Sequence, residues 1–166
     1  MAELNRDQRF LPCLLDRLRD DDPKNSEESR NQRVISMPRY KEFVVRDLQW
    51  LFNSSAHLPE ETSGGTSLDA FPEAKRSVIN YGLRQLCGLT APDMGALERD
   101  LSDALKFFEP RILRHTLSLK ASLDRHLVAF ELRAELWAEP VPERLYVQTL
   151  VDLENGQVAL GDRGNG

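Results

Sequence analysis

The stretch Phe107-Phe108-Glu109-Pro110-Arg111-Ile112 marks the point at which the hydrophobic pattern of the chain changes. In the residues before it, from Met94 onward, apolar side chains recur every three or four positions, which predicts one face of a helix. After it, apolar side chains alternate with polar ones, which predicts strands with one buried face. Pro110 disfavours the helical conformation for Glu109, so the helix should end there. Helices first and strands last are typical of an α+β fold.

The junction itself carries two charges whose role the sequence leaves open. A carboxylate at a helix C-terminus, such as Glu109, is unfavourable by up to about 1 kcal/mol unless a cation compensates it. In an extended chain Arg111 lies on the same side as Glu109, and Arg114 lies on the opposite side. One interpretation is a local ion pair that fixes the turn. The other is that these side chains reach a partner, because guanidinium groups suit the paired recognition of carboxylates.

An amphipathic helix is predicted near the N-terminus, over residues 10–19. Its leucines recur at helical spacing and form one stripe: Leu11, Leu14, Leu15 and Leu18. Asp20-Asp21-Asp22-Pro23 ends this helix, because proline prevents continuation and carboxylates are unfavourable at a helix C-terminus. Residues 24–33 are polar and are predicted to form a solvated tether. The leucine stripe is therefore a candidate docking surface that can pack on a partner as easily as on its own domain.

Three further helices are predicted: residues 38–53, residues 77–86 and the helix that ends at Glu109. Pro38 suits a first helical turn. The apolar stripe of the helix that it opens is interrupted by Asp47, beside Arg46. Thr90, with Asp93 three residues later, resembles a capping box, which predicts the start of the helix that precedes the junction.

The second half of the chain is predicted to form a small antiparallel sheet of about four strands that ends in a β-hairpin. The expected strands are residues 113–119, 128–136, 145–153 and the short edge strand Val158, Ala159 and Leu160. Asn155-Gly156 before the last strand suits a tight hairpin turn. The expected division is an N-terminal helix (1–22), a polar tether (23–37), a single α+β domain (38–160) and a disordered tail (161–166).

Composition narrows the function classes. With 166 residues the chain suits one domain, and a 40% hydrophobic and 30% charged content is typical of a soluble globular protein. The N-terminus has no signal-peptide layout and no apolar run is long enough for a bilayer, so we expect a cytoplasmic protein without direct membrane insertion. The formal charge of −5 argues against nucleic acid as a partner. The two cysteines are expected to be buried free thiols.

The sequence predicts no catalytic, cofactor or metal site. Glu109 follows two phenylalanines and is a candidate for half of a glycosidase carboxylate pair, but no second acid is specified. The three histidines lack metal-ligand spacing, and His115 is expected to be partly buried on the leucine face of its strand. Trp50 and Trp137 are expected to be core or interface anchors.

Four stretches, in this order, carry a resemblance to a known family: Leu14-Leu15-Asp16-Arg17-Leu18, Val45-Arg46-Asp47-Leu48-Gln49-Trp50-Leu51-Phe52-Asn53, Ser77-Val78-Ile79-Asn80-Tyr81-Gly82-Leu83 and Phe108-Glu109-Pro110-Arg111-Ile112. With them the chain resembles TssE, the baseplate wedge family of bacterial type VI secretion systems. That family is similar in turn to the lysozyme-like wedge proteins of contractile phage baseplates. The hairpin around Asn155-Gly156 fits the C-terminal part of the family.

The resemblance implies a structural role. TssE-like subunits join TssF and TssG in the wedge and form the platform on which the TssB–TssC sheath begins to polymerise. The Glu-Pro-Arg motif of the family maps onto Glu109, Pro110 and Arg111, and it implies assembly rather than hydrolysis. An open edge at residues 158–160 can take up a strand from a sheath subunit by backbone pairing. A peptidoglycan hydrolase and an independent adaptor of the same fold remain as alternatives.

Overall fold

The computed structural model describes residues 10–18, 24, 34–56, 68–83, 93–125, 127–139, 141–153 and 158–161, with only the backbone of residues 69 and 158–161. Its helices are α1 (Leu14–Leu18), α2 (Met37–Asn53), η2 (Leu68–Ala70), α3 (Pro72–Lys75), η3 (Val78–Asn80) and α4 (Met94–Phe108). Its strands are β1 (Ser118–Asp124), β2 (Leu127–Leu136), β3 (Glu143–Asp152) and β4 (Val158–Gly161). Most of the predicted tether, the Asn155-Gly156 turn and the tail lie outside the described residues.

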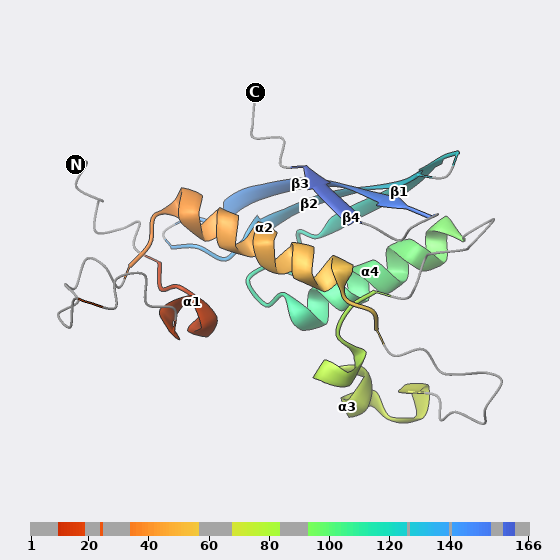
Figure 1. Ribbon diagram of the computed structural model, residues 1–166, viewed down its shortest axis with the longest axis horizontal. Helices are drawn as coiled ribbons and strands as arrows, with labels where there is room; N and C mark the ends of the chain where they lie inside the picture. The colour runs from red at the N-terminus through yellow and green to blue at the C-terminus, as the bar shows by residue number, and fades with distance from the viewer. Residues whose placement is uncertain are drawn as a thin grey trace.

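The fold is two layers, an antiparallel sheet and two long helices (Figure 1). The strands lie in the order β1-β2-β3-β4, with every neighbouring pair antiparallel. Three long strands carry the sheet, and β4 adds four residues alongside β3. On one face of the sheet, α4 lies near β1 and α2 lies near β4. The predicted α+β class is confirmed.

The core forms where the apolar stripes of both helices meet the alternating apolar positions of the sheet. In β2 every second side chain from Val128 to Leu136 is buried, and β3 continues the same face with Leu145, Val147, Thr149 and Val151. From the helices, Val44, Leu48 and Leu105 are fully buried between the layers. Each buried leucine of this kind contributes about 1.5–3 kcal/mol relative to an exposed one.

The boundaries of α2 and α4 follow from local chemistry. Pro38 lies in the first turn of α2, as predicted. The N-cap of α4 is Asp93 itself, whose carboxylate accepts hydrogen bonds from the N–H groups of Gly95 (2.9 Å) and Ala96 (3.1 Å). The expected capping box with Thr90 as the cap was therefore wrong, because Asp93 takes the cap position rather than the third helical one.

The first predicted strand begins later than expected. Residues 113–117 alternate like a strand but form a turn, and β1 runs from Ser118 to Asp124. Thr116 explains the turn, because its hydroxyl donates to the Leu113 carbonyl (2.8 Å) and accepts from the Glu135 N–H (2.9 Å). His115 lies in this turn and is exposed, so the expectation of a partly buried histidine was wrong.

In the segment between α2 and α4, the described residues form short helical turns, and residues 77–83 do not continue as the helix predicted over residues 77–86. In its described part, η3 is a single 3₁₀ turn that Ser77 caps through its hydroxyl, and the chain then extends to Leu83. Gly82 has φ +120°, and a Cβ there would come within 2.2 Å of the Ser54 carbonyl oxygen. Glycine is required at this point because residue 83 pairs in parallel with residue 55, at the end of α2.

Candidate functional site: a chain of ion pairs at the helix–strand junction

Backbone hydrogen bonds hold the junction against the end of β2. Glu109 has left the helical region (φ −121°, ψ 80°) and caps α4, which confirms the helix end predicted from Pro110. The Leu113 N–H donates to the Glu135 carbonyl at 2.9 Å, and the Trp137 N–H donates to the Arg111 carbonyl at 2.7 Å. The corner between α4 and the sheet is therefore fixed by main-chain pairing.

Glu109 and Arg111 form the local ion pair that the sequence left as one of two interpretations. Arg111 donates from Nε to Glu109 Oε1 at 2.6 Å and from Nη2 to Oε2 at 2.5 Å. The Arg111 backbone N–H also donates to Oε1, at 3.2 Å. Glu109 is only 4% exposed. Both of its carboxylate oxygens are thus engaged by Arg111.

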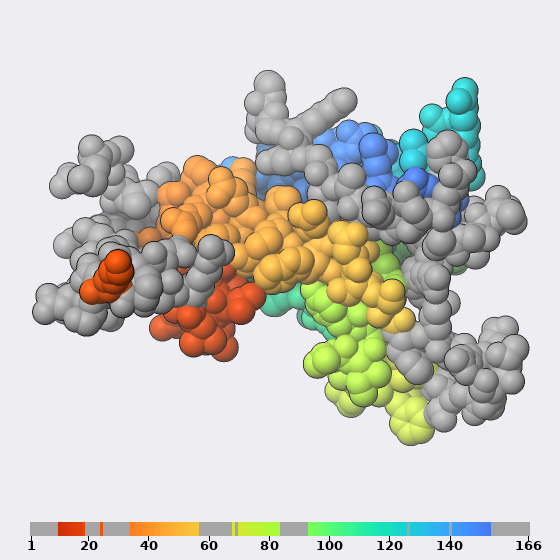
Figure 2. Space-filling view, viewed as in Figure 1, coloured from red at the N-terminus to blue at the C-terminus, as the bar shows by residue number. Residues whose placement is uncertain are grey.

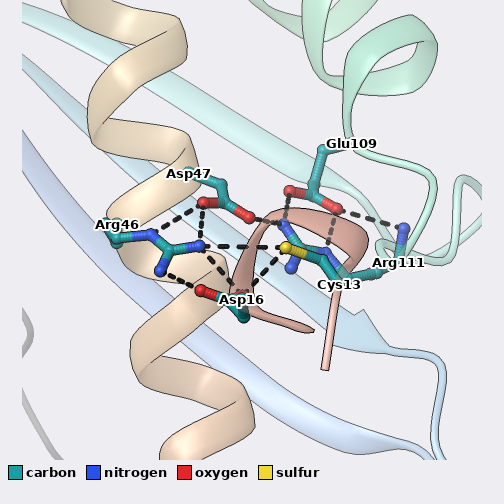
Figure 3. Close-up of polar contacts among 6 residues, drawn as sticks. All are labelled: Cys13, Asp16, Arg46, Asp47, Glu109 and Arg111. Atoms are coloured by element: carbon teal, nitrogen blue, oxygen red, sulfur yellow. Dashed lines mark hydrogen bonds and ion pairs between the residues drawn. The ribbon is translucent and has the colours of Figure 1, made fainter. Parts of the chain in front are cut away.

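The pair does not end at the junction, because it continues into α2 and α1 (Figure 3). Arg111 Nη2 also donates to Asp47 Oδ2 at 2.7 Å. Asp47 Oδ1 accepts from Arg46 Nε (2.9 Å) and Nη2 (2.7 Å). Arg46 binds both oxygens of Asp16 in α1, and its Nη2–Asp16 Oδ2 distance is 3.1 Å. Three carboxylates and two guanidinium groups alternate, and they join segments far apart in the sequence.

Burial and charge together set the protonation states along this chain of ion pairs. Hydrogen bonds from Arg46 lower the pKa of Asp16 below its ordinary value of 3.8, against the opposing effect of its burial. Burial acts to lower the pKa of Arg111, but its bonds to Glu109 and Asp47 outweigh burial and raise it. The Asp16 hydrogen bond is the main cause that raises the pKa of Arg46. Both arginines therefore stay charged, which keeps the network ionic.

Aromatic rings flank the outer end of the network. The Arg46 guanidinium lies over the Phe43 ring (4.9 Å to the centroid) and over the Trp50 ring (4.8 Å). Trp50 is 47% exposed, so it is an anchor on the surface rather than in the core. The Cys13 thiol donates to Asp16 Oδ2 at 2.8 Å and is free but only partly buried, in contrast to the expected buried thiol.

The side-chain contacts of this arrangement join three segments of the chain through charged hydrogen bonds. Both carboxylate oxygens of Glu109, the candidate glycosidase acid, accept hydrogen bonds from the Arg111 guanidinium. Among the described residues, no group of three or more His, Cys, Asp or Glu could hold a metal ion. Every buried side-chain nitrogen or oxygen in that part of the chain has a hydrogen-bond partner.

Comparison with known families then identifies the chain. A family model described as baseplate wedge protein gp25 matches residues 39–141, more than half of the 166 residues. The chain belongs to the baseplate wedge protein gp25 family. This is the family of TssE, so the resemblance drawn from the four sequence stretches is confirmed. Neither the curated proteins nor the solved structures give a match.

The matched residues of the gp25 family contain the inner part of the network and leave out its outer end. Arg46, Asp47, Glu109 and Arg111 lie within the match, whereas Asp16 precedes it. The leucine stripe (Leu11, Leu14, Leu15 and Leu18) and the edge residues (Val158, Ala159 and Leu160) also lie outside the match. The match thus runs from α2 through β2 and includes the junction.

The three predicted groups of site residues differ in their surroundings, and the ion pairs join the junction to the helix that carries the leucine stripe. The leucine stripe faces solvent, with exposures from 54% for Leu15 to 73% for Leu18. Of the described residues 10–18 in the predicted helix, only the five residues of α1 are helical. The backbone of residues 158–161 lies at the sheet edge beside β3. Sequence reasoning missed Asp16, Arg46 and Asp47 as members of the site. The signals were the charged Arg46-Asp47 pair within the apolar stripe of α2 and the place of all three residues in the stretches that carry the family resemblance.

Proposed function

We propose that this chain is a non-enzymatic structural subunit of a type VI secretion baseplate wedge in the cytoplasm, where it joins TssF and TssG to the contractile sheath and helps to initiate sheath polymerisation. The observation that carries this proposal is the gp25-family match, which includes the whole Glu109-Pro110-Arg111 junction. In support, among the described residues, no helix is both long and apolar enough to cross a membrane. Baseplate wedge membership also implies assembly with other baseplate proteins.

The junction supports assembly because it makes a rigid corner. An ion pair ties the junction at the end of α4 to α2, and backbone hydrogen bonds tie it to β2, so one corner joins both helices to the sheet. A rigid subunit can bind two partners in a fixed relative position without ordering flexible segments, so little conformational entropy is lost on binding. Side chains that are only partly exposed, such as Asp47 and Arg111 at about one fifth each, can still meet a partner group.

The leucine stripe supports docking on TssF and TssG. Its four side chains are exposed in the free chain, and burying each contributes about 1.5–3 kcal/mol to association before entropy costs are subtracted. We expect Leu14→Glu and Leu18→Glu to weaken binding to a TssF–TssG complex while the unfolding free energy stays unchanged. Arg17→Glu, on the same helix and exposed, is the matched control. Loss of binding in the control as well would assign the effect to charge rather than to the leucines.

The edge position of β4 supports a role in starting the sheath. An open strand edge offers unpaired N–H and C=O groups to which an incoming strand can add. Neighbouring backbone N–H groups of a strand point to opposite edges, so only one of Val158→Pro and Ala159→Pro removes an outward donor. We expect that variant to fold normally and to abolish sheath assembly, while the other loosens the β3–β4 pairing. Normal sheaths with both variants would overturn strand addition at this edge.

The enzyme alternative has a direct test. Glu109, the one acid that the sequence offered for glycoside hydrolysis, has both oxygens on Arg111. Purified protein should therefore release no soluble fragments from peptidoglycan. Digestion that Glu109→Gln abolishes would establish a hydrolase instead. An independent adaptor of the same fold is separated by genome context, because a wedge subunit should be encoded beside sheath and baseplate genes.

A further inference from the structure

The side chain of Asp16 joins the N-terminal helix α1 to α2 through charged hydrogen bonds. None of its residues is buried, and its leucines face solvent. The space-filling view shows α1 lying against the N-terminal half of α2 (Figure 2). In the described part of the chain before it, Phe10 is buried, stacked on Tyr40 with 5.0 Å between the ring centroids. Phe10 also pairs with Ile35 through two backbone hydrogen bonds. From α1 itself, Asp16 makes charge-assisted hydrogen bonds to Arg46 in α2.

The Arg46 guanidinium, which binds Asp16, is arranged as a carboxylate-binding site. Arg46 donates from Nε and Nη2 to Asp47, which fixes the orientation of the guanidinium plane. Its Nη1 and Nη2 also donate to Asp16. Phe43 and Trp50 lie within 5 Å of the guanidinium carbon and limit its access to water. A planar guanidinium held in one orientation binds a carboxylate through two parallel hydrogen bonds and suits no neutral or cationic group as well.

The occupant of this site sits on a short helix that the apolar core does not retain. Asp16 is itself only 7% exposed at its side chain, so it fills the site closely. The α1 leucines remain 54–73% exposed, so the hydrophobic effect retains α1 far less than it retains α2 and α4. Binding of those leucines elsewhere would therefore withdraw Asp16 chiefly at the cost of its polar contacts.

We propose that Arg46, Phe43 and Trp50 form a carboxylate-binding site with an exchangeable occupant. In the free subunit Asp16 occupies it and latches α1 to α2. When the leucine stripe engages a neighbouring subunit, α1 leaves, and an acidic side chain of that subunit takes the place of Asp16. The latch and the site are properties of the isolated chain; only this exchange rests on the proposed wedge function. The device keeps Arg46 from binding unrelated carboxylates before assembly.

Amide hydrogen exchange on the full-length chain tests the latch. The Arg17 N–H donates to the Cys13 carbonyl at 3.0 Å and reports on α1. Asp16→Asn should speed exchange in residues 14–18 about tenfold, equal to about 1.4 kcal/mol, and leave α2, α4 and β2 unchanged. Raising the salt to about 0.5 M should have a similar effect on the unaltered chain, because screening weakens the pair. Arg17→Gln, the matched change of charge on α1, should leave exchange unchanged. Equal rates in Asp16→Asn and the unaltered chain would overturn the latch.

A synthetic peptide of residues 10–18 tests whether the site takes a carboxylate from another molecule. Added under reducing conditions to the Asp16→Asn protein, it should shift the Trp50 indole resonance saturably, and Trp137 should not move. The same peptide carrying Asp16→Asn should bind at least tenfold more weakly, and the unaltered chain, whose site is filled, should also respond weakly. Equal binding of both peptides, or no response in the Asp16→Asn protein, would overturn the site. Neither measurement involves TssF or TssG, so failure of the wedge function would not change either result.

Discussion

Removal of the Arg111 side chain should destabilise the protein more than any surface charge would. The change Arg111→Ala takes both guanidinium bonds from Glu109, which is 4% exposed and would keep only the Arg111 backbone N–H at 3.2 Å. Breaking a buried ion pair by deleting one partner costs about 3–5 kcal/mol. Arg111 is 21% exposed and solvent screens part of the interaction, so the lower end applies, about 3 kcal/mol. That is a large share of the roughly 5–15 kcal/mol that stabilises a typical domain.

Urea unfolding at neutral pH measures this cost, with two variants as controls. Arg133→Ala breaks the exposed Arg133–Glu131 pair, whose side chains are 3.6 Å apart, and should cost less than about 1 kcal/mol. The double change Glu109→Met with Arg111→Met replaces the buried pair by apolar groups and should recover most of the loss, because replacement of a buried pair is often neutral. A cost for Arg111→Ala no larger than that of the Arg133 control would refute the view that the junction is a buried staple.

Three further predictions concern single features of the fold. Gly82→Ala should lower the free energy of unfolding by about 1–3 kcal/mol, because φ +120° strains any residue with a side chain. Gly95→Ala, in α4, should leave that free energy unchanged or raise it slightly, and thermal unfolding of both variants measures the difference. Asp93→Ala should cost about 1 kcal/mol through loss of the α4 cap, and an unchanged midpoint would contradict the cap. Arg46 lowers the pKa of Asp16 in the folded state, so the Asp16–Arg46 pair stabilises the folded protein fully at pH values above 3.8, the ordinary pKa of Asp16. This stabilisation is lost as the pH falls through the lower pKa that Asp16 has in the folded state. A carboxyl NMR titration midpoint at or above 3.8 for Asp16 would contradict this pairing.

The parts of the fold that local periodicity encodes were predicted well. The end of α4 at Glu109 needed only Pro110, and the strands β2 and β3 needed only alternation over about ten residues. The turn over residues 113–117 was missed because its leucines alternate as a strand would. What bends the chain there is Thr116, whose hydroxyl competes for backbone groups of the turn and of β2.

Within the site, only the contact between residues close together in the sequence was predicted. Glu109 and Arg111 are two residues apart, so their pairing follows from backbone geometry. Asp47 is 64 residues from Arg111, and Asp16 is 30 residues from Arg46, so no local pattern specifies either contact. The charged pair in the apolar stripe of α2 carried a signal, because a charge on a buried face requires a partner. The sequence could not say which cation or carboxylate that partner would be.

The most direct test of the central claim is sheath formation in the cells that encode this chain. With a fluorescent TssB subunit, deletion of the gene should abolish sheath structures, and the unaltered gene supplied in trans should restore them. Restoration should fail with whichever of Val158→Pro and Ala159→Pro blocks the outward edge, although that protein accumulates and folds. Sheaths of normal number and length in the deletion strain would contradict a role for this protein in the baseplate wedge.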